Sequence, residues 1–229
     1  MNNRKLYNVI MIKHVIFDMD GLLLSTEPIY FLCYQRAADK MGQTFPFELY
    51  EACVGMSTSD AAKIIDNYFK GAVDVKQLYR YAYDEFENYI FNGGEVDFRP
   101  GAKEAVQYFS ERGFLLALAS SNIRRWVDFL LDKKGVRQFF PVITTSEDVS
   151  KPKPDPEIYL VTASKLHAAP NECLSFEDSV AGATASIRAE MRVCVVPQIK
   201  QPDTFVRERA FKVYESLEDI YPDIDELLR

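Results

Sequence analysis

The segment "FDMDGLLLSTE", residues 17–27, places two aspartates one residue apart at the end of an apolar run. The run that leads into it, "HVIF" (14–17), favours a buried β-strand. Gly21 follows the second acid directly and indicates a turn. Asp18 and Asp20 therefore stand where a buried strand gives way to a turn, and a pair of acids at such a point suggests a functional role.

The composition limits the classes of protein that fit. The chain has 229 residues, of which 48% are apolar, so it can form one large domain or a domain with a smaller insert around a sizeable core. Its formal charge of −7 and pI near 5.0 argue against a nucleic-acid partner or a membrane surface, both of which need a basic face. An anionic substrate must then be attracted by a local feature, such as a metal ion or a few lysines.

The sequence contains no signal for export or for a membrane. No stretch approaches the roughly eighteen consecutive apolar residues of a transmembrane span, and the start, "MNNRKLYNVIMIKH", lacks the features of a secretory signal. We expect residues 1–10 to be a non-essential extension. The cysteines lack metal-ligand spacing and fit reduced thiols in a cytoplasmic protein; they are Cys33, Cys53, Cys173 and Cys194. The oligomeric state stays open, and a monomer is compatible with the sequence.

From residue 98 onward, helical and strand patterns alternate. Asp155 as N-cap and Pro156 at the first helical position mark the start of one of these helices. Alternation of this kind implies a parallel sheet with right-handed crossovers. The predicted strands are 114–120, 141–145, 173–178 and 192–197, and the predicted helices are 102–113, 123–134, 155–167 and 179–190.

Residues 28–97 break this rhythm, because they contain helical patterns but no convincing strand. The helical patterns cover 28–41, 46–53, 58–69 and 75–92. A turn-rich segment, "NGGEVDFRPG" (92–101), leads back to the alternating part. We therefore expect an α/β core built from residues 1–27 and 98–229, with a helical cap (28–97) inserted after the first strand.

Polar residues follow several of the predicted strands. Ligands of open parallel sheets bind at the carboxyl ends of the strands, so these residues are expected to meet at one edge. They are Asp18 and Asp20 after the first strand, Ser120, Ser121 and Asn122 after the second, Lys151 in the loop "SKPKPD", and Glu177 and Asp178 after the fourth.

Each residue type has a use in phosphoryl transfer. Clustered carboxylates repel one another unless a cation lies between them, and ligands that are all oxygen suit Mg²⁺. Asp18 could be both a ligand and a nucleophile that forms an aspartyl-phosphate, while Asp20 could act as general acid and then as general base. Ser120 and neighbouring backbone N–H groups could hold phosphate oxygens. Lys151 would supply local positive charge. Taken singly, each of these is an ordinary surface feature; their coincidence at one edge is what points to a site.

Four motifs of this chain resemble those of the haloacid dehalogenase-like hydrolases, in their branch of β-phosphoglucomutases and small-metabolite phosphatases. The motifs are "FDMDGLLLSTE", "LALASSN", "SKPKPD" and "SFEDSVAG". The resemblance implies a Rossmann-like parallel sheet with a four-helix cap. It implies Asp18 as nucleophile and Asp20 as acid/base. It also implies Mg²⁺ held by Asp18, the backbone carbonyl of Asp20, and Asp178, with Glu177 close by, and phosphate contacts from Ser120, Ser121 and Lys151.

The chain departs from the mutase pattern at three positions in the predicted cap. Tyr30 stands about where mutases have a histidine, Thr58 stands where they have an arginine, and "YAYDE" (81–85) lacks their lysine. The arginine and lysine help to hold a sugar bisphosphate, so their absence argues against mutase activity. Ser25 also replaces an acid that is usual in the related phosphatases.

The leading hypothesis is therefore a Mg²⁺-dependent phosphatase of a small phosphomonoester, such as a sugar, polyol or nucleoside phosphate. A hexose-phosphate mutase is the alternative. A non-catalytic binding protein that keeps the fold is a second alternative, and the presence of Asp18 and Asp20 counts against it. Specificity is expected from the cap helix 28–41 and the loop "CVGMSTSD" (53–60), with Gly55, Met56, Ser57 and Thr58 as the candidate residues.

Overall fold

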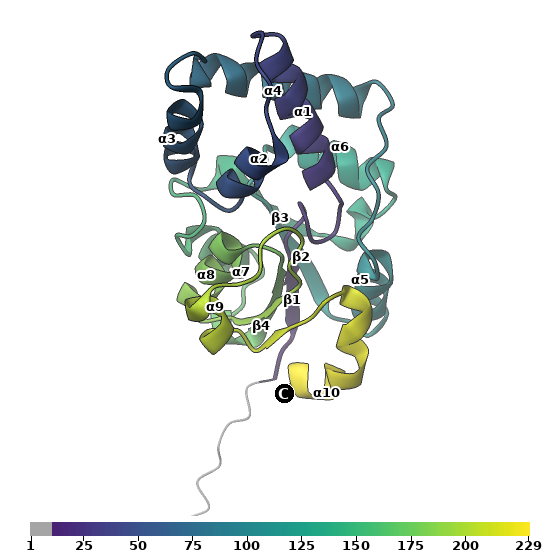
Figure 1. Cartoon of the computed structure of the whole chain (residues 1–229). Coiled ribbons are helices and arrows are strands. Elements are labelled where there is room, and N and C mark those ends of the chain that lie inside the picture. Colours follow the sequence, from purple (N-terminus) through teal and green to yellow (C-terminus); the bar gives the residue numbers. More distant parts are fainter. Residues whose placement is uncertain (1–10) are drawn as a thin grey trace, which may run out of the picture.

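A single parallel sheet forms the centre of the molecule (Figure 1). The structure is a computed structural model that describes residues 11–229, so the expectation for residues 1–10 lies outside the described part. Within that part, six strands are arranged in the order β3-β2-β1-β4-β5-β6, and every neighbouring pair is parallel. The strands are β1 (His14–Phe17), β2 (Leu115–Ala119), β3 (Val142–Thr144), β4 (Cys173–Glu177), β5 (Arg192–Val195) and β6 (Lys212–Val213). The predicted parallel sheet is confirmed, and β6 is an additional edge strand.

Helices cover both faces of the sheet because alternate strand residues point to opposite sides. Val15 and Phe17 of β1 pack in the core cluster that also contains α5 and α6, whereas Ile16 packs with α7 and α8. Figure 1 shows α7 and α8 on one side of the strands and α5 on the other. These helices are α5 (Ala102–Glu111), α6 (Arg124–Lys133), α7 (Glu157–Lys165) and α8 (Val180–Arg188), followed by the short α9 (Thr204–Arg209) and α10 (Ile224–Leu227).

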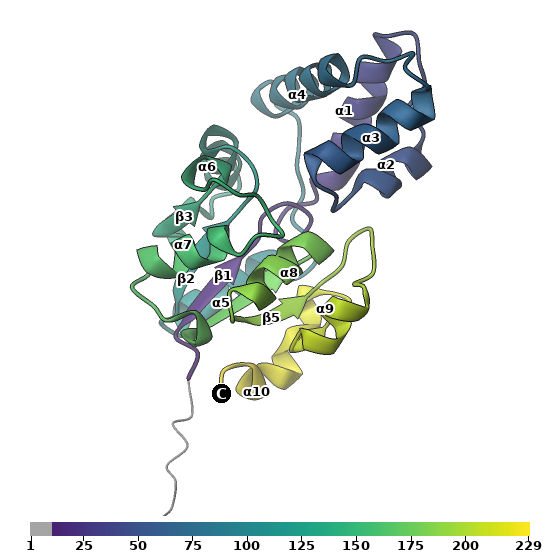
Figure 2. The same ribbon diagram turned by 90° about the vertical axis from the view of Figure 1, so that its left-hand side faces the viewer.

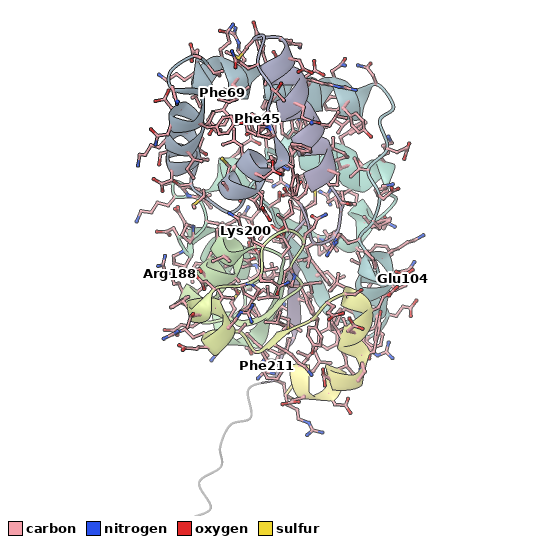
Figure 3. All side chains as sticks on the ribbon, in the orientation of Figure 1. Phe45, Phe69, Glu104, Arg188, Lys200 and Phe211 are labelled. Carbon is pink, nitrogen blue, oxygen red and sulfur yellow. The ribbon has the colours of Figure 1, made fainter. Side chains whose placement is uncertain are left out.

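Four helices are inserted between β1 and α5, as the sequence predicts. They are α1 (Glu27–Asp39), α2 (Phe47–Cys53), α3 (Thr58–Phe69) and α4 (Val75–Phe91), and we call them the helical insert. Figure 2 shows them as a separate layer beyond the carboxyl ends of the strands. The insert has its own aromatic interior, in which Phe45 and Phe69 are buried with ring centroids 6.1 Å apart (Figure 3).

The insert leaves the core and returns to it at adjacent points. Leu24 and Phe98 form an antiparallel bridge, and the backbone N–H of Ser25 donates to the carbonyl of Asp97 at 2.8 Å. The sheet and the insert are therefore joined by a narrow two-stranded connection. Among residues 11–229, no helix combines the length and the apolar character needed to span a membrane.

Candidate active site

The two aspartates of the opening motif lie at the carboxyl end of β1, the strand that β2 and β4 flank. Asp18 is buried and follows the last residue of the strand directly. The next turn brings Gly21 against Asp178, and a Cβ atom at Gly21 would lie only 2.1 Å from Asp178 Oδ2. Gly21 also has a φ of +79°, a backbone conformation that favours glycine. Both this conformation and the close approach to Asp178 therefore require glycine at this position.

The carboxylate of Asp20 is held by three side chains from two segments, α1 and the loop that follows β2. It accepts hydrogen bonds from Ser120 Oγ at 3.2 Å, Asn122 Nδ2 at 2.8 Å and Tyr30 OH at 3.2 Å. Asn122 Nδ2 also donates to Tyr30 OH at 2.8 Å. Burial raises the pKa of Asp20, and the hydrogen bonds from Tyr30 and Ser120 oppose that rise in part. A carboxyl group with a raised pKa in such a setting can hold and release a proton.

The lysine of the site is Lys153, and the prediction of Lys151 is wrong. Lys153 Nζ donates to Asp18 Oδ1 at 2.6 Å, to Glu177 Oε1 at 2.6 Å and to the carbonyl of Ala119 at 3.0 Å. The Lys151 side chain is instead 71% exposed and lies 3.7 Å from Asp155, away from the acids. Both lysines belong to the same loop, and its backbone path turns the second one inward. Burial lowers the pKa of Lys153, but the charges of Asp18 and Glu177 outweigh that effect and raise it.

Glu177 is completely buried at the end of β4, and its carboxylate accepts hydrogen bonds from several neighbouring side chains. Besides Lys153, Tyr159 OH donates to it at 2.5 Å and Ser179 Oγ donates at 3.3 Å. A Cβ atom at Gly182 would lie 2.0 Å from Glu177 Oε1, so only glycine lets α8 pack this closely over the carboxylate. The apolar spacing of α7 gives no sign of a role for Tyr159, so its hydrogen bond to Glu177 cannot be predicted from the sequence.

Asp18, Glu177 and Asp178 form a group of carboxylates whose oxygens lie within 4.8 Å of one another. Asp178 takes part in none of the hydrogen bonds that engage Asp18 and Glu177. Burial raises the pKa of Asp178, and the negative charges of Asp18 and Glu177 raise it further. A hard cation would relieve this repulsion, and the donor set, which is all oxygen, fits Mg²⁺. The Asp20 carboxylate belongs to the separate network around Tyr30 and Asn122.

A cavity of about 580 Å³ opens between the helical insert and the core. Of the predicted specificity residues, Gly55, Met56 and Thr58 line it. Ser57 has another task, because its Oγ accepts a hydrogen bond from the Asp60 N–H at 3.1 Å and so caps α3. Ser121 is exposed and lines the core side of the cavity.

Comparison with known proteins places this chain in one family. Residues 15–196 match the sequence model of the haloacid dehalogenase-like hydrolases. The match covers most of the chain, which therefore belongs to this hydrolase family, as its four motifs predict.

Individual relatives agree with this assignment. The phosphorylated carbohydrates phosphatase of Thermotoga maritima is 32% identical over 181 residues, which are 75% of this chain and 79% of that protein. The solved structure of CbbY from Rhodobacter sphaeroides in complex with phosphate superposes with a TM-score of 0.75 at 22% identity, covering 92% of this chain and 96% of that one. A β-phosphoglucomutase from Clostridium difficile superposes with a TM-score of 0.75 at 22% identity, over 95% of this chain and 97% of that one. At these identities, the two structural matches establish the fold alone.

Proposed function

We propose that this protein is a Mg²⁺-dependent phosphatase that hydrolyses a small phosphomonoester through an aspartyl-phosphate intermediate. The observation that carries the proposal is the arrangement around Asp18. Its buried carboxylate lies beside the Lys153 ammonium at 2.6 Å, and the hydrogen-bonded carboxyl of Asp20 follows two residues later. The name of the Thermotoga relative, a phosphatase of phosphorylated carbohydrates, supports the same reaction.

In the first half of the reaction, a carboxylate oxygen of Asp18 attacks phosphorus and the bond from phosphorus to the alcohol oxygen breaks. Asp20 donates its proton to the departing alkoxide, so the alcohol leaves neutral. Lys153, Ser120 and the backbone N–H groups next to Ser120 stabilise the charge on the phosphoryl group. Mg²⁺ held by Asp18, Asp178 and the backbone carbonyl of Asp20, with Glu177 close by, would offset the repulsion between the carboxylates and the phosphoryl oxygens.

In the second half, Asp20 takes a proton from water as the water attacks phosphorus. The bond between Asp18 and phosphorus breaks, inorganic phosphate leaves, and both aspartates return to their starting states. The same residue serves as acid and then as base, because donating its proton in the first half leaves the carboxylate that accepts a proton from water in the second.

We also propose that the helical insert, residues 28–97, acts as a cap over a core of residues 1–27 and 98–229. The position of the cavity between insert and core supports this division. The four cysteines are free thiols, which suits a reducing compartment such as the cytoplasm. A small phosphorylated metabolite is the expected partner.

The mutase alternative is less well supported. No lysine, arginine or histidine lines the described cavity, so a second phosphate group would find no cation there. A non-catalytic binding role would leave the raised pKa of Asp20 and the pairing of Asp18 with Lys153 without a use.

The test is turnover of p-nitrophenyl phosphate with and without Mg²⁺, alongside β-glucose 1-phosphate with a bisphosphate primer. We expect Mg²⁺-dependent release of phosphate and no glucose 6-phosphate. Asp18→Asn should abolish turnover and leave the circular dichroism spectrum unchanged, because an amide is nearly isosteric but a poor nucleophile. Activity of this variant within about tenfold of wild type would refute the assignment of Asp18 as nucleophile.

A further inference from the structure

The cavity next to Asp20 has an aromatic lining for which the proposed reaction alone has no use. Eight of its twenty lining residues are Phe, Tyr or Trp. Four of them form a continuous series of ring contacts, with centroids 4.4 Å apart for Tyr30–Phe86, 4.8 Å for Phe86–Trp126 and 4.4 Å for Tyr83–Trp126. These rings come from both sides of the cavity, because Trp126 belongs to α6 of the core and the others belong to the insert.

The aromatic wall leads directly to the reacting groups. Tyr30 stacks on Phe86 with one face, while its hydroxyl donates to Asp20 at 3.2 Å. Asn122 also lines the cavity and donates to the same carboxylate at 2.8 Å. A phosphoryl group at Asp18 and Asp20 would therefore have its alcohol portion in contact with the rings.

The charge of the lining restricts that alcohol portion further. Glu27 is the only charged residue among those that line the described cavity, and Tyr50 OH donates to its Oε2 at 2.5 Å. Lys200 comes close to the same loop, but its Nζ is engaged by the carbonyls of Ala52 and Val54 at 3.1 and 2.9 Å. An additional phosphate or carboxylate on the substrate would thus face aromatic rings and one acid.

We infer that the substrate is a phosphomonoester whose alcohol portion carries an uncharged planar ring, of the kind found in nucleoside monophosphates. A planar ring can stack on these side chains with its whole face, whereas a sugar offers them only its C–H groups. The Glu27–Tyr50 pair offers oxygen atoms to a ring N–H group or a hydroxyl. This inference rests on the proposed function, because it names the substrate class of the same site.

The test compares uridine 5′-monophosphate with ribose 5-phosphate, which share the phosphorylated sugar and differ by the ring. With Mg²⁺, we expect kcat/KM to be higher for uridine 5′-monophosphate by roughly tenfold or more, the scale of one stacked base. Tyr83→Ala should lower this ratio several-fold, because Tyr83 supplies one ring of the wall. The control is Tyr68→Ala, since Tyr68 is an exposed tyrosine of the same insert that does not line the cavity, and it should leave the ratio unchanged.

A binding measurement separates this inference from the proposed reaction. Trp126 is the only tryptophan of the chain and lines the cavity, so tryptophan fluorescence reports on this wall of the cavity. Uridine 5′-monophosphate should quench it in Asp18→Asn, and ribose 5-phosphate should not. Quenching without turnover of any phosphate ester would refute the proposed phosphatase activity but support the binding of a planar ring in the cavity. Equal kcat/KM or equal quenching for the two ligands would overturn the ring site and keep the phosphatase. Neither turnover nor quenching would overturn both.

Discussion

At the scale of single residues, the ammonium group of Lys153 offsets the negative charge of two buried carboxylates in the site. Its side chain is 7% exposed, and it lies between Asp18 and the fully buried Glu177. Burying three charges is costly, but removing one partner of such a group is costlier, since the remaining charges have no compensation. We therefore expect Lys153 to support both the fold and the proposed reaction.

Replacing Lys153 with methionine should reveal both roles. Lys153→Met is expected to lower kcat by at least about a hundredfold and to lower the free energy of unfolding by about 3–5 kcal/mol. Lys151→Met is the matched control, because Lys151 lies in the same loop but is exposed, and it should change neither quantity. Kinetics on an accepted phosphate ester and urea unfolding measure the two effects. Equal results for the two variants would contradict the assignment of Lys153.

The hydroxyl of Tyr30 should influence the pH dependence of the reaction. It donates to the Asp20 carboxylate, which favours the charged form and lowers the pKa of Asp20 against the larger effect of burial. Tyr30→Phe keeps the ring and removes the donor, so the pKa of Asp20 should rise. The acid form of Asp20 would then persist to higher pH, and the alkaline limb of the pH profile of kcat should move upward. A profile that moves downward or stays in place would show that Tyr30 does not act on Asp20.

The sequence predicts some of these residues and cannot predict others. Asp18 and Asp20 are recognisable because they follow a buried strand directly, where a parallel sheet exposes its residues to ligands. Lys151 and Lys153 cannot be told apart in this way, because their loop has no periodicity that indicates which side chain points inward. Tyr30 is noticeable in the sequence only as a departure from the mutase pattern, and its hydrogen bond to Asp20 becomes evident only in three dimensions.

At the scale of elements, Lys200 links the core to the insert. It follows β5 in the chain, yet its Nζ donates to the carbonyls of Ala52 and Val54, at the C-terminal end of α2. Figure 3 shows Lys200 at the level where the insert meets the core. Carbonyl groups at the end of a helix lack partners within the helix, so a lysine from another segment can stabilise that end.

Lys200→Met should loosen this link without unfolding the core. We expect faster amide hydrogen exchange at the end of α2 and a several-fold higher KM, because the loop that follows α2 lines the cavity. Lys103→Met, at an exposed position on α5, is the control and should have no effect. Unchanged exchange at residues 52–56 in Lys200→Met would show that these hydrogen bonds do not hold α2 in place.

The elements that the sequence predicts well are those with long, regular patterns. The helices of the insert agree with their predicted ranges to within about two residues, the usual uncertainty of helix ends. α7 begins at Glu157, later than the predicted Asp155, although Asp155 Oδ1 still accepts a hydrogen bond from the Glu157 N–H at 3.1 Å. β6 has two residues and exists only by pairing with β5, so no local pattern could predict it.

At the scale of the whole molecule, the connection between insert and core allows a hinge. Gly93 has a φ of +92° and open space around it, so it can take up backbone rotation. Gly94 is more constrained, because its carbonyl accepts a hydrogen bond from Lys133 Nζ at 2.6 Å and a Cβ atom there would lie 2.5 Å from the Tyr89 ring. Rotation is therefore expected at Gly93 and not at its neighbour.

We expect the insert to close over the site when Mg²⁺ and a fluoride-based phosphoryl mimic are bound. Closure would separate the site from bulk water, apart from the molecule that the second half of the reaction consumes, and would bring residues 55–60 toward Asp20. Solution X-ray scattering should give a smaller radius of gyration, and hydrogen exchange should slow in residues 55–60 and 92–98. If the mimic binds and neither measurement changes, the insert is a fixed wall and the hinge is wrong.

The narrow connection between the two parts also bears on how such a chain can change over generations. The backbone enters and leaves the insert at neighbouring points, since Arg99 N–H donates to the carbonyl of Leu23 at 2.9 Å just beside the Leu24–Phe98 bridge. Strands β1 and β2 can pair whatever lies between them, because the entropy of closing a loop grows only slowly with its length. Insertions, deletions or exchanges between those two points therefore change the stability of the sheet only slightly. The residues that break the phosphate ester and those that select its alcohol are free to diverge at different rates. The same reaction can therefore be retained while the substrate changes.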